Sequence, residues 1–275
     1  MNEDLFEPSR DELILESIIS ETPYDEVAGS RIEALLLELK AKFEDAGSGS
    51  WITSIPTMHR NIFRGQALGT EVTAAQLSAI SDGSFDDLYV GDYWAINNVT
   101  YRVADMDKYL GTGDTPFTKH HLVIVPDEPL YNINANRIND LYINSTMRTT
   151  GLAGARTTIN AAFPGMVLTY RNHFEGSDFT NADVELMSQI LVLGSVVQPW
   201  TSGTPLPHRL DISQLALFAL APQFIRCSSA YWLRDNDARA NTYFININAK
   251  GIISDDDGNT NQFGARPYFL IGAAE

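Results

Sequence analysis

The sequence predicts an α+β fold that is mainly β, with short helices at the N-terminus and a β-rich body. Turn-forming residues are frequent, with 19 Gly and 12 Pro among 275 residues, alongside many Asn and Thr. From Trp51 onward, strand-like patterns dominate over helical ones. Hydrophobic residues make up 44% of the chain and aromatic residues 10%, which is enough for a packed core and excludes a wholly disordered chain.

Charge divides the chain into two parts. Positions 1–46 hold 13 acidic and 4 basic residues, a net charge of −9, whereas the remaining 229 positions have a net charge of −7. Such asymmetry usually marks a distinct segment. We therefore expect an N-terminal helical module at 1–46, a Gly/Ser linker at 47–55 and a β-rich domain at 56–275.

Two helix starts repeat inside the N-terminal module. Ser9 with Glu12 and Ser30 with Glu33 each fit the capping box, in which both side chains bind orphan backbone N–H groups. The apolar stripe of the second helix spans about three turns, which is too short to be stable alone in water. It could dock on its own domain, but we favour a homo-oligomeric bundle, as a homotrimer, or an anchor on a larger assembly. The residues expected in this role are Ile14, Ile18, Ile32, Leu35, Leu36, Leu39 and Phe43.

Three local patterns predict the first elements of the body. A Thr followed three residues later by Gln is a capping box and opens a short helix. Two strand-like runs around a pair of asparagines predict a hairpin. An apolar run that ends at a proline predicts a buried strand. In chain order these are a helix at 73–80, a hairpin of 87–95 and 99–103 around Asn97 and Asn98, and a strand at 121–125.

The second half of the body mixes helical and strand patterns. A partly helical segment contains glycines that predict a break, and a later apolar segment fits either a helix or a buried strand. The C-terminal stretch reads as strands joined by acidic turns. These elements are expected at 145–163 with a break near 151–154, at 183–193, and at 231–271 with turns at 235–237 and 255–258.

Net charge and the apolar runs limit the expected partners and location. The chain has 19 Lys and Arg against 35 Asp and Glu, a net charge of −16, which disfavours binding to nucleic acid or to an anionic membrane. Its N-terminus is acidic, unlike a secretory signal, and no apolar run reaches the roughly 20 residues of a membrane helix. We expect synthesis in a cytoplasm, no cleaved signal peptide and no membrane partner.

Motifs that carry chemistry are scarce in this sequence. A phosphate-binding loop, a dinucleotide-binding glycine motif, a His-Glu-x-x-His motif and a nucleophile elbow are all missing, which lowers the expectation of a common enzyme class. The single cysteine, Cys227, excludes an internal disulfide and a multi-cysteine zinc site. We favour a buried structural thiol there and expect no catalytic residue, metal or cofactor.

Three polar groups leave alternatives open. For His120 and His121, packing is favoured over a metal or catalytic role, because neighbours in a strand point to opposite faces. For His173 with Glu175 and Asp178, a solvated loop is favoured over a site. For residues 255–261, alternating oxygen-bearing side chains suit calcium, but the glycine is misplaced for an EF-hand, so an acidic turn is favoured.

The C-terminal third combines aromatic residues with many asparagines. Rings supply contact area, and amides both donate and accept hydrogen bonds, so the pattern suits an adaptable contact surface. The same asparagines could instead occupy turns.

Several motifs are spread over nearly the whole chain. They lie in segments 64–93, 118–126, 217–222, 231–234 and 264–269, which include Gly65, Gly69, Val90, Asp92, Tyr93, Trp232, Arg234, Arg266 and Pro267. Jointly these motifs resemble an uncharacterised family of bacteriophage structural proteins from phages and prophages of Clostridia-like hosts. The two Ser-Arg-x-Glu helix starts before a Gly/Ser joint also look like the N-termini of such virion proteins.

The body is also similar to the C-type-lectin-like fold, in its Trp-Leu-Arg run, its glycine-containing hairpin and its Gly-x-Arg-Pro before a final strand. Within that fold, phage receptor-binding proteins meet their targets with an Asn- and aromatic-rich C-terminal surface, while Trp232 and Arg266 would be mostly structural. The resemblance implies that the ligand-contacting residues are Trp232, Asn236, Asn241, Tyr243, Asn246, Asn248, Asn259 and Asn261.

Together these resemblances imply a non-enzymatic virion surface protein that is anchored by its N-terminal helices. It would be a capsid decoration protein or head fibre, or a tail fibre or receptor-binding protein, and its partners would be other virion proteins and a host surface glycan or protein. The alternatives are a tail-associated hydrolase of cell wall or polysaccharide, and a calcium-dependent sugar-binding module. A hydrolase would need two carboxylates about 5–10 Å apart in a cleft.

Overall fold

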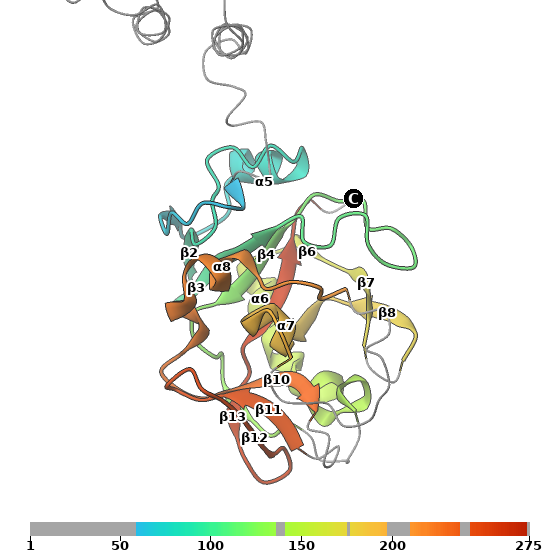
Figure 1. Cartoon of the computed structure of the whole chain (residues 1–275). Coiled ribbons are helices and arrows are strands. Elements are labelled where there is room, and N and C mark those ends of the chain that lie inside the picture. Colours follow the sequence, from blue (N-terminus) through green and yellow to red (C-terminus); the bar gives the residue numbers. More distant parts are fainter. Residues whose placement is uncertain (1–58, 136–140, 175–176, 197–209, 237–242, 274–275) are drawn as a thin grey trace, which may run out of the picture. The chain divides into compact units, whose positions relative to one another are not determined.

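The computed structural model describes residues 59–135, 141–174, 177–196, 210–236 and 243–273 (Figure 1), which all lie in one compact unit, Ile55–Glu275. The module expected at 1–46 and the linker expected at 47–55 lie outside the described residues. So do all the residues predicted to oligomerise or anchor the chain: Ile14, Ile18, Ile32, Leu35, Leu36, Leu39 and Phe43.

A seven-stranded mixed sheet forms the larger layer of the body. Its first two strands pair in parallel, and the remaining pairs are antiparallel. The last strand of the chain lies inside the sheet, so the C-terminus closes the core. The strand order is β1 (Ala67–Gly69), β2 (Tyr93–Ile96), β3 (Val99–Met106), β4 (Leu122–Pro126), β14 (Pro267–Ile271) and β6 (Val167–Leu168), with β9 (Val184–Leu186) also paired to β14.

A five-stranded sheet lies at the lower end of the body in Figure 1. Its order is β12 (Ile253–Asp257), β11 (Tyr243–Ile247), β10 (Tyr231–Asn236), β13 (Phe263–Gly264) and β5 (Asn132–Ile133). A separate two-stranded ribbon consists of β7 (Tyr170–His173) and β8 (Phe179–Ala182).

Short helices complete the α+β, mainly β fold that the sequence predicted. Among the described residues, α5 (Ala74–Ser81) lies at the upper end in Figure 1, and α8 (Ala216–Leu220) packs on β3. The same part of the chain also forms α6 (Ala153–Ala162) and α7 (Gln189–Leu193), with a π-helix at Met147–Gly151 and 3₁₀ turns at Tyr142–Asn144 and Pro222–Ile225. No helix in the described part of the chain combines the length and apolar character needed to cross a bilayer.

The capping box, the hairpin turn and the buried strand predicted for the first half are confirmed. The Thr73 side chain accepts from the Gln76 backbone N–H, and the Gln76 side chain accepts from the Thr73 N–H, so both halves of the capping box exist. Asn97 and Asn98 have φ of 51° and 64°, the left-handed values that a tight hairpin turn requires. Every residue of β4 is buried, as predicted for this run.

Residues 87–92 are not a strand, contrary to the prediction. The Asp92 carboxylate instead accepts hydrogen bonds from the backbone N–H groups of Tyr89 (2.8 Å) and Gln66 (2.9 Å) and pairs with Arg64. Asp87 and Gly91 have φ of 52° and 88°, which breaks a strand pattern. A buried carboxylate therefore shapes this segment as a loop.

In the second half, the predicted helices and strands exist, but the bounds of the elements and of the turns between them differ from the prediction. The expected turn at 235–237 is wrong at its start, because β10 continues through Asn236 and Asp235 is buried, where it accepts from the Gln189 N–H at 2.7 Å. The expected turn at 255–258 begins only at Gly258, since β12 runs to Asp257. The segment 145–163 forms the π-helix and α6, while 183–193 divides into β9 and α7.

The chain enters the body through a closely fastened segment, residues 59–66, which we call the entry segment. His59 Nδ1 lies 2.8 Å from the Leu88 carbonyl oxygen, and Arg60 pairs with Asp105. The Arg64 backbone N–H donates to the Val90 carbonyl oxygen (2.9 Å) next to the parallel bridge between Phe63 and Val90. These contacts bind the entry segment to three separate residues between positions 88 and 105. The entry segment is therefore held at the edge of the large sheet.

An aromatic cluster fills the core between the large sheet and α6. Tyr101 is fully buried and meets the rings of Phe163 (5.0 Å) and Phe269 (6.0 Å) edge to face, and Trp94 meets Phe163 in the same way. The Tyr101 hydroxyl has no hydrogen-bond partner among the described residues. Burial raises the pKa of Tyr101 to about 12.

Replacement of Tyr101 by Phe should raise the free energy of unfolding by about 1 kcal/mol, because the buried hydroxyl is desolvated without compensation. Urea denaturation of both proteins would measure the change. Tyr142→Phe is the matched control, since the Tyr142 hydroxyl donates to Glu185 (2.7 Å) and accepts from the Leu186 N–H (2.9 Å). That variant should lose about 1–3 kcal/mol. A similar loss in Tyr101→Phe would contradict the prediction.

Candidate binding surface

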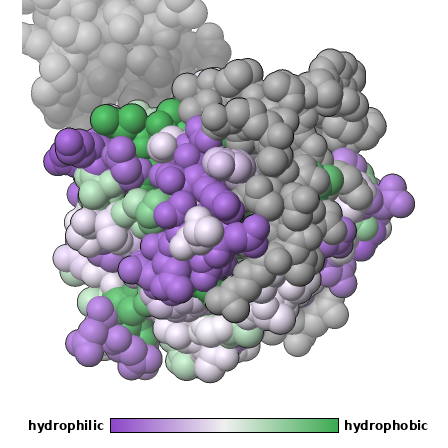
Figure 2. Space-filling view, turned by 90° about the horizontal axis from the view of Figure 1, so that it is seen from below, coloured by the Kyte–Doolittle hydropathy of each residue, from purple (hydrophilic) through white to green (hydrophobic). Residues whose placement is uncertain are grey.

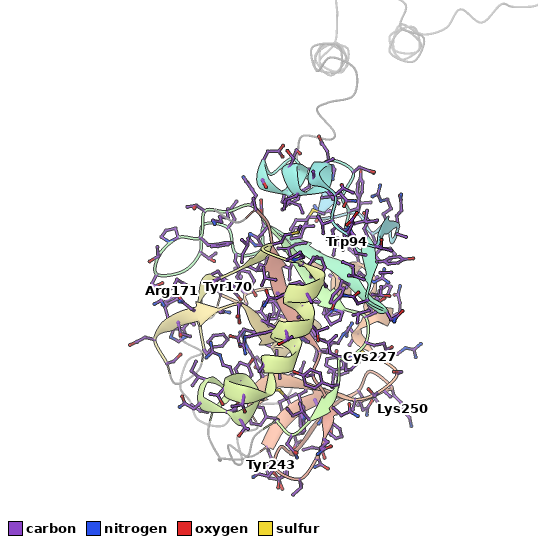
Figure 3. All side chains as sticks on the ribbon, turned by 180° about the vertical axis from the view of Figure 1, so that it is seen from behind. Trp94, Tyr170, Arg171, Cys227, Tyr243 and Lys250 are labelled. Atoms are coloured by element: carbon purple, nitrogen blue, oxygen red, sulfur yellow. The ribbon has the colours of Figure 1, made fainter. Side chains whose placement is uncertain are left out.

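The five-stranded sheet carries most of the residues that the sequence analysis assigned to ligand contact. Asn241 lies outside the described residues, and the other seven lie on β10, on β11 or in the turns on either side of β12. Figure 3 shows Tyr243 and Lys250 together at this end of the body, opposite the end near Trp94. The sheet therefore brings the predicted residues to one end, but their exposure differs.

Trp232 is a core residue and not a surface contact. It is fully buried, its Nε1–H donates to the Ile133 carbonyl oxygen at 2.8 Å, and its ring packs on Phe263 at 4.6 Å. Arg266 is also fully buried, where it donates to the Pro126 carbonyl oxygen at 2.9 Å. The structural roles expected for Trp232 and Arg266 are thus confirmed, and Trp232 is unavailable to a ligand at the surface.

Two asparagines bind one aspartate inside the sheet. Asn246 is 1% exposed, and its Nδ2 donates to Asp256 Oδ2 at 2.9 Å. Asn261 Nδ2 lies 3.4 Å from the other oxygen of Asp256. The Asn246 amide therefore joins β11 to β12, whereas the Asn261 amide joins the turn after β12 back to that strand. Asn246 is buried too deeply to contact a partner.

Asn248 closes the turn between β11 and β12. Its Oδ1 accepts from the backbone N–H groups of Lys250 (2.9 Å) and Ile252 (3.1 Å). Asn236 is buried at the end of β10. Of the predicted contact residues, Asn259 is exposed, and Tyr243, Asn248 and Asn261 are half-buried. Among the described residues of this set, Asn259 is therefore the one whose side chain is most open to a partner.

The calcium alternative receives little support from the geometry at 255–261. Asp257 Oδ1 accepts from the Asn259 backbone N–H at 2.8 Å, and Asp256 is already bound by two amides. Across the parts of the chain that the structure describes, no group of three or more His, Cys, Asp or Glu side chains could hold a metal ion. Residues 255–261 form an edge strand and a turn.

The other polar residues that the sequence singled out have packing roles. His120 Nδ1 lies 2.7 Å from Asp107 Oδ2, and His121 is fully buried beside the same aspartate. Cys227 is 7% exposed, its Sγ lies 3.3 Å from the Asp127 carbonyl oxygen, and burial raises its pKa to about 11. His173 packs edge to face on Phe179, while Glu175 lies outside the described residues.

Sequence analysis missed a buried ion pair at the centre of the body. Asp211 is 1% exposed and pairs with Arg234 of β10. It also accepts from the hydroxyls of Tyr109 (3.0 Å) and Ser188 (2.7 Å). Nothing in the local sequence distinguishes Asp211 from an ordinary loop carboxylate.

Hydroxyl groups extend this network toward the large sheet. Arg234 Nη1 lies 3.4 Å from the Tyr268 hydroxyl, which is 2.6 Å from the hydroxyl of Tyr170. Asn172 Nδ2 donates to the Tyr170 hydroxyl at 2.9 Å. The network therefore connects β10, β14 and β7, with each polar group satisfied by another.

A second buried carboxylate, Glu185 on β9, is also satisfied internally. It is 1% exposed, and burial raises its pKa. The Tyr142 hydroxyl donates to it at 2.7 Å, and Arg148 of the π-helix pairs with it at 2.9 Å. The guanidinium groups of Arg148 and Arg234 lie 4.8 and 4.9 Å from the ring centroid of Phe174. The Glu185 carboxyl could donate a proton to a substrate only if its side chain first became exposed.

An open pocket of about 430 Å³ lies beside α5. Its carboxylates disfavour an anionic ligand, and one of them, Asp87, pairs with Arg64. The pocket is lined by Ala75, Gln76, Ser78, Ala79, Asp82, Ser84, Asp86 and Asp87.

Comparison of the chain with protein-family models, with curated proteins and with solved structures found no match.

Asn246→Ala should lower the free energy of unfolding by about 1–3 kcal/mol, because it removes a buried amide bonded to Asp256. Asn259→Ala, at an exposed position, should change it by less than about 0.5 kcal/mol. Guanidinium denaturation of the two variants gives the comparison. Equal effects would show that burial does not separate the roles of these two asparagines.

Proposed function

We propose that this chain is a non-enzymatic virion protein of a bacteriophage. Its N-terminal helices anchor it to the particle as a homotrimer, and the described body is displayed outward. It serves as a capsid decoration or head fibre, or as a tail fibre or receptor-binding protein. A lectin-like relationship of the body belongs to the same proposal and rests on the Trp-Leu-Arg and Gly-x-Arg-Pro segments.

What supports a display role is the way the body uses its charged residues. Arginine side chains pair with carboxylates that are distant in sequence, and most of these pairs are partly or fully buried. Planar guanidinium groups in such pairs fix geometry well, and they hold loops that secondary structure alone would leave unsupported. The pairs are Arg60–Asp105, Arg64–Asp92, Arg102–Asp127, Arg148–Glu185, Arg156–Asp183, Arg171–Asp114 and Arg234–Asp211.

The edge of the five-stranded sheet also suits a protein displayed in many copies. Its edge strand, β12, contains Asp255, Asp256 and Asp257 in succession. Charge on an edge strand opposes pairing with the edge of another molecule. Figure 2, which views the body from this end, shows hydrophilic residues gathered near the middle of the face. Such a surface keeps crowded copies apart.

Immunogold labelling of purified phage particles with an antibody against the full chain tests the location. Labelling over the head would identify a capsid decoration, and labelling at the tail tip would identify a host-recognition protein. Absence of the chain from particles by mass spectrometry would remove the virion proposal.

The oligomer can be tested through the predicted apolar stripe. The full chain should sediment at three times its 30.4 kDa mass. Leu35→Asp/Leu39→Asp should reduce this to the monomer, because charge in the stripe prevents helix association. Ala34→Asp/Ala41→Asp, at positions outside the stripe, is the control with the same added charge and should stay trimeric. A trimer that survives in the leucine variant would contradict an N-terminal bundle.

The alternative of a hydrolase needs an accessible general acid with a raised pKa. Burial raises the pKa of Glu185, but its side chain is 1% exposed and pairs with Arg148. Release of reducing ends from host cell-wall material would support it. If release occurs, Glu185→Gln should abolish it, whereas Asp255→Asn on the edge strand should leave it unchanged.

A further inference from the structure

The segment that joins β3 to β4, residues 107–121, closes on itself; we call it the 107–121 loop. The Asp107 N–H donates to the His121 carbonyl oxygen at 2.9 Å, which brings the two ends together. Inside the loop, the Gly111 N–H donates to Phe117 (2.7 Å), and the Phe117 N–H donates to Thr112 (2.9 Å). Such self-contained loops can open as a unit while the rest of a protein stays folded.

Side chains fasten the loop to the rest of the body. Each of these contacts joins one loop residue to a residue on another segment. The contacts are Lys108 Nζ to the Ser213 carbonyl oxygen (2.7 Å), the Tyr109 hydroxyl to Asp211 (3.0 Å) and Asp114 to Arg171 (2.8 Å). Figure 3 shows Arg171 at the side of the body, next to Tyr170.

His121 lies fully buried under the loop, and its two ring nitrogens have different partners. Nε2 lies 3.2 Å from the Tyr109 backbone N–H, which can only donate, so Nε2 must accept. Nδ1 lies 2.9 Å from the Lys119 carbonyl oxygen, which can only accept, so Nδ1 must donate. The neutral ring with its proton on Nδ1 satisfies both partners, and the closed loop therefore requires this form.

Aromatic rings surround the same side chain. The ring centroids of Phe117 and Tyr109 lie 5.2 and 6.3 Å from that of His121. Tyr109 and Phe117 in turn lie 4.6 and 6.1 Å from Tyr170 on β7. A second proton on His121 would thus place a buried positive charge among these rings. It would also convert Nε2 from an acceptor into a donor that faces the donor N–H of Tyr109.

The charged groups around His121 act in both directions. Burial is the largest influence and lowers the pKa of His121, and His120 acts in the same direction. The hydrogen bond to the Lys119 carbonyl oxygen opposes it, as do Asp107, with Oδ1 3.7 Å away, and Asp105 on β3. Since the pKa is lower in the closed loop than in an opened one, the neutral ring stabilises closure above about pH 6.5. That stabilisation is lost as the pH falls through the lowered value.

We propose that the 107–121 loop is an acid-sensitive flap, in which protonation of His121 opens the loop before the body unfolds. Opening uncovers Tyr109, Phe117 and the Tyr170 side chain beneath them. Two effects of protonation favour opening. The Nε2–H and the Tyr109 N–H, both donors, face each other, and the imidazolium charge is buried.

Hydrogen exchange of the full chain at pH 7.5 and pH 5.0, corrected for intrinsic rates, tests the flap. Amides of the loop should exchange about tenfold faster at pH 5.0, because opening is coupled to uptake of one proton by His121. Amides of β4 and β14 should keep their protection. Equal changes in loop and sheet, or no change in the loop, would overturn the proposal.

Two variants identify the titrating group. His121→Gln should remove the pH dependence of loop exchange, and His120→Gln, at the neighbouring and more exposed histidine, should retain it. Because His121→Gln could fail to fold, nitrogen-15 NMR of the wild-type rings gives an independent measurement. At pH 7.5, His121 should carry its proton on Nδ1, and its titration should coincide with loop opening. A proton on Nε2 at pH 7.5, or titration without opening, would contradict the mechanism.

Discussion

The buried pair of Asp211 and Arg234 is the interaction on which most of the body depends. Both side chains are removed from water, and neither charge could stay there without the other. The Asp211 carboxylate also accepts hydrogen bonds from the hydroxyls of Tyr109, in the 107–121 loop, and of Ser188, the N-cap of α7. Three segments that are distant in the sequence, the 107–121 loop, the start of α7 and β10, are thus positioned by one carboxylate, which explains how short strands and short helices form one core.

Local chemistry accounts for the parts of the fold that the sequence predicted. The capping box at Thr73 and the asparagine pair at Asn97 and Asn98 act within a few residues, so their effect can be read from the chain alone. The errors come from acidic residues. Asp92 and Asp235 resemble ordinary loop and turn residues in sequence, yet each is buried and bonded to the backbone of another segment. Such partners are set by the tertiary fold, and no local pattern reveals them.

The same reason explains why several of the predicted contact residues are buried. Asparagine suits both a binding surface and the inside of a turn, because its amide can satisfy either a partner or its own backbone. In the sequence, Asn246 and Asn259 look alike. The structure separates them, since one binds Asp256 inside the sheet and the other lies exposed on a turn.

The entry segment has a mechanical consequence. The polypeptide runs parallel to its neighbour where Phe63 bridges Val90 and where β1 meets β2. Its anchors at His59, Arg60 and Arg64 reach Leu88, Asp105 and Asp92. Tension applied to the chain upstream of His59 would therefore load several of these bonds at once, and not a single terminal contact.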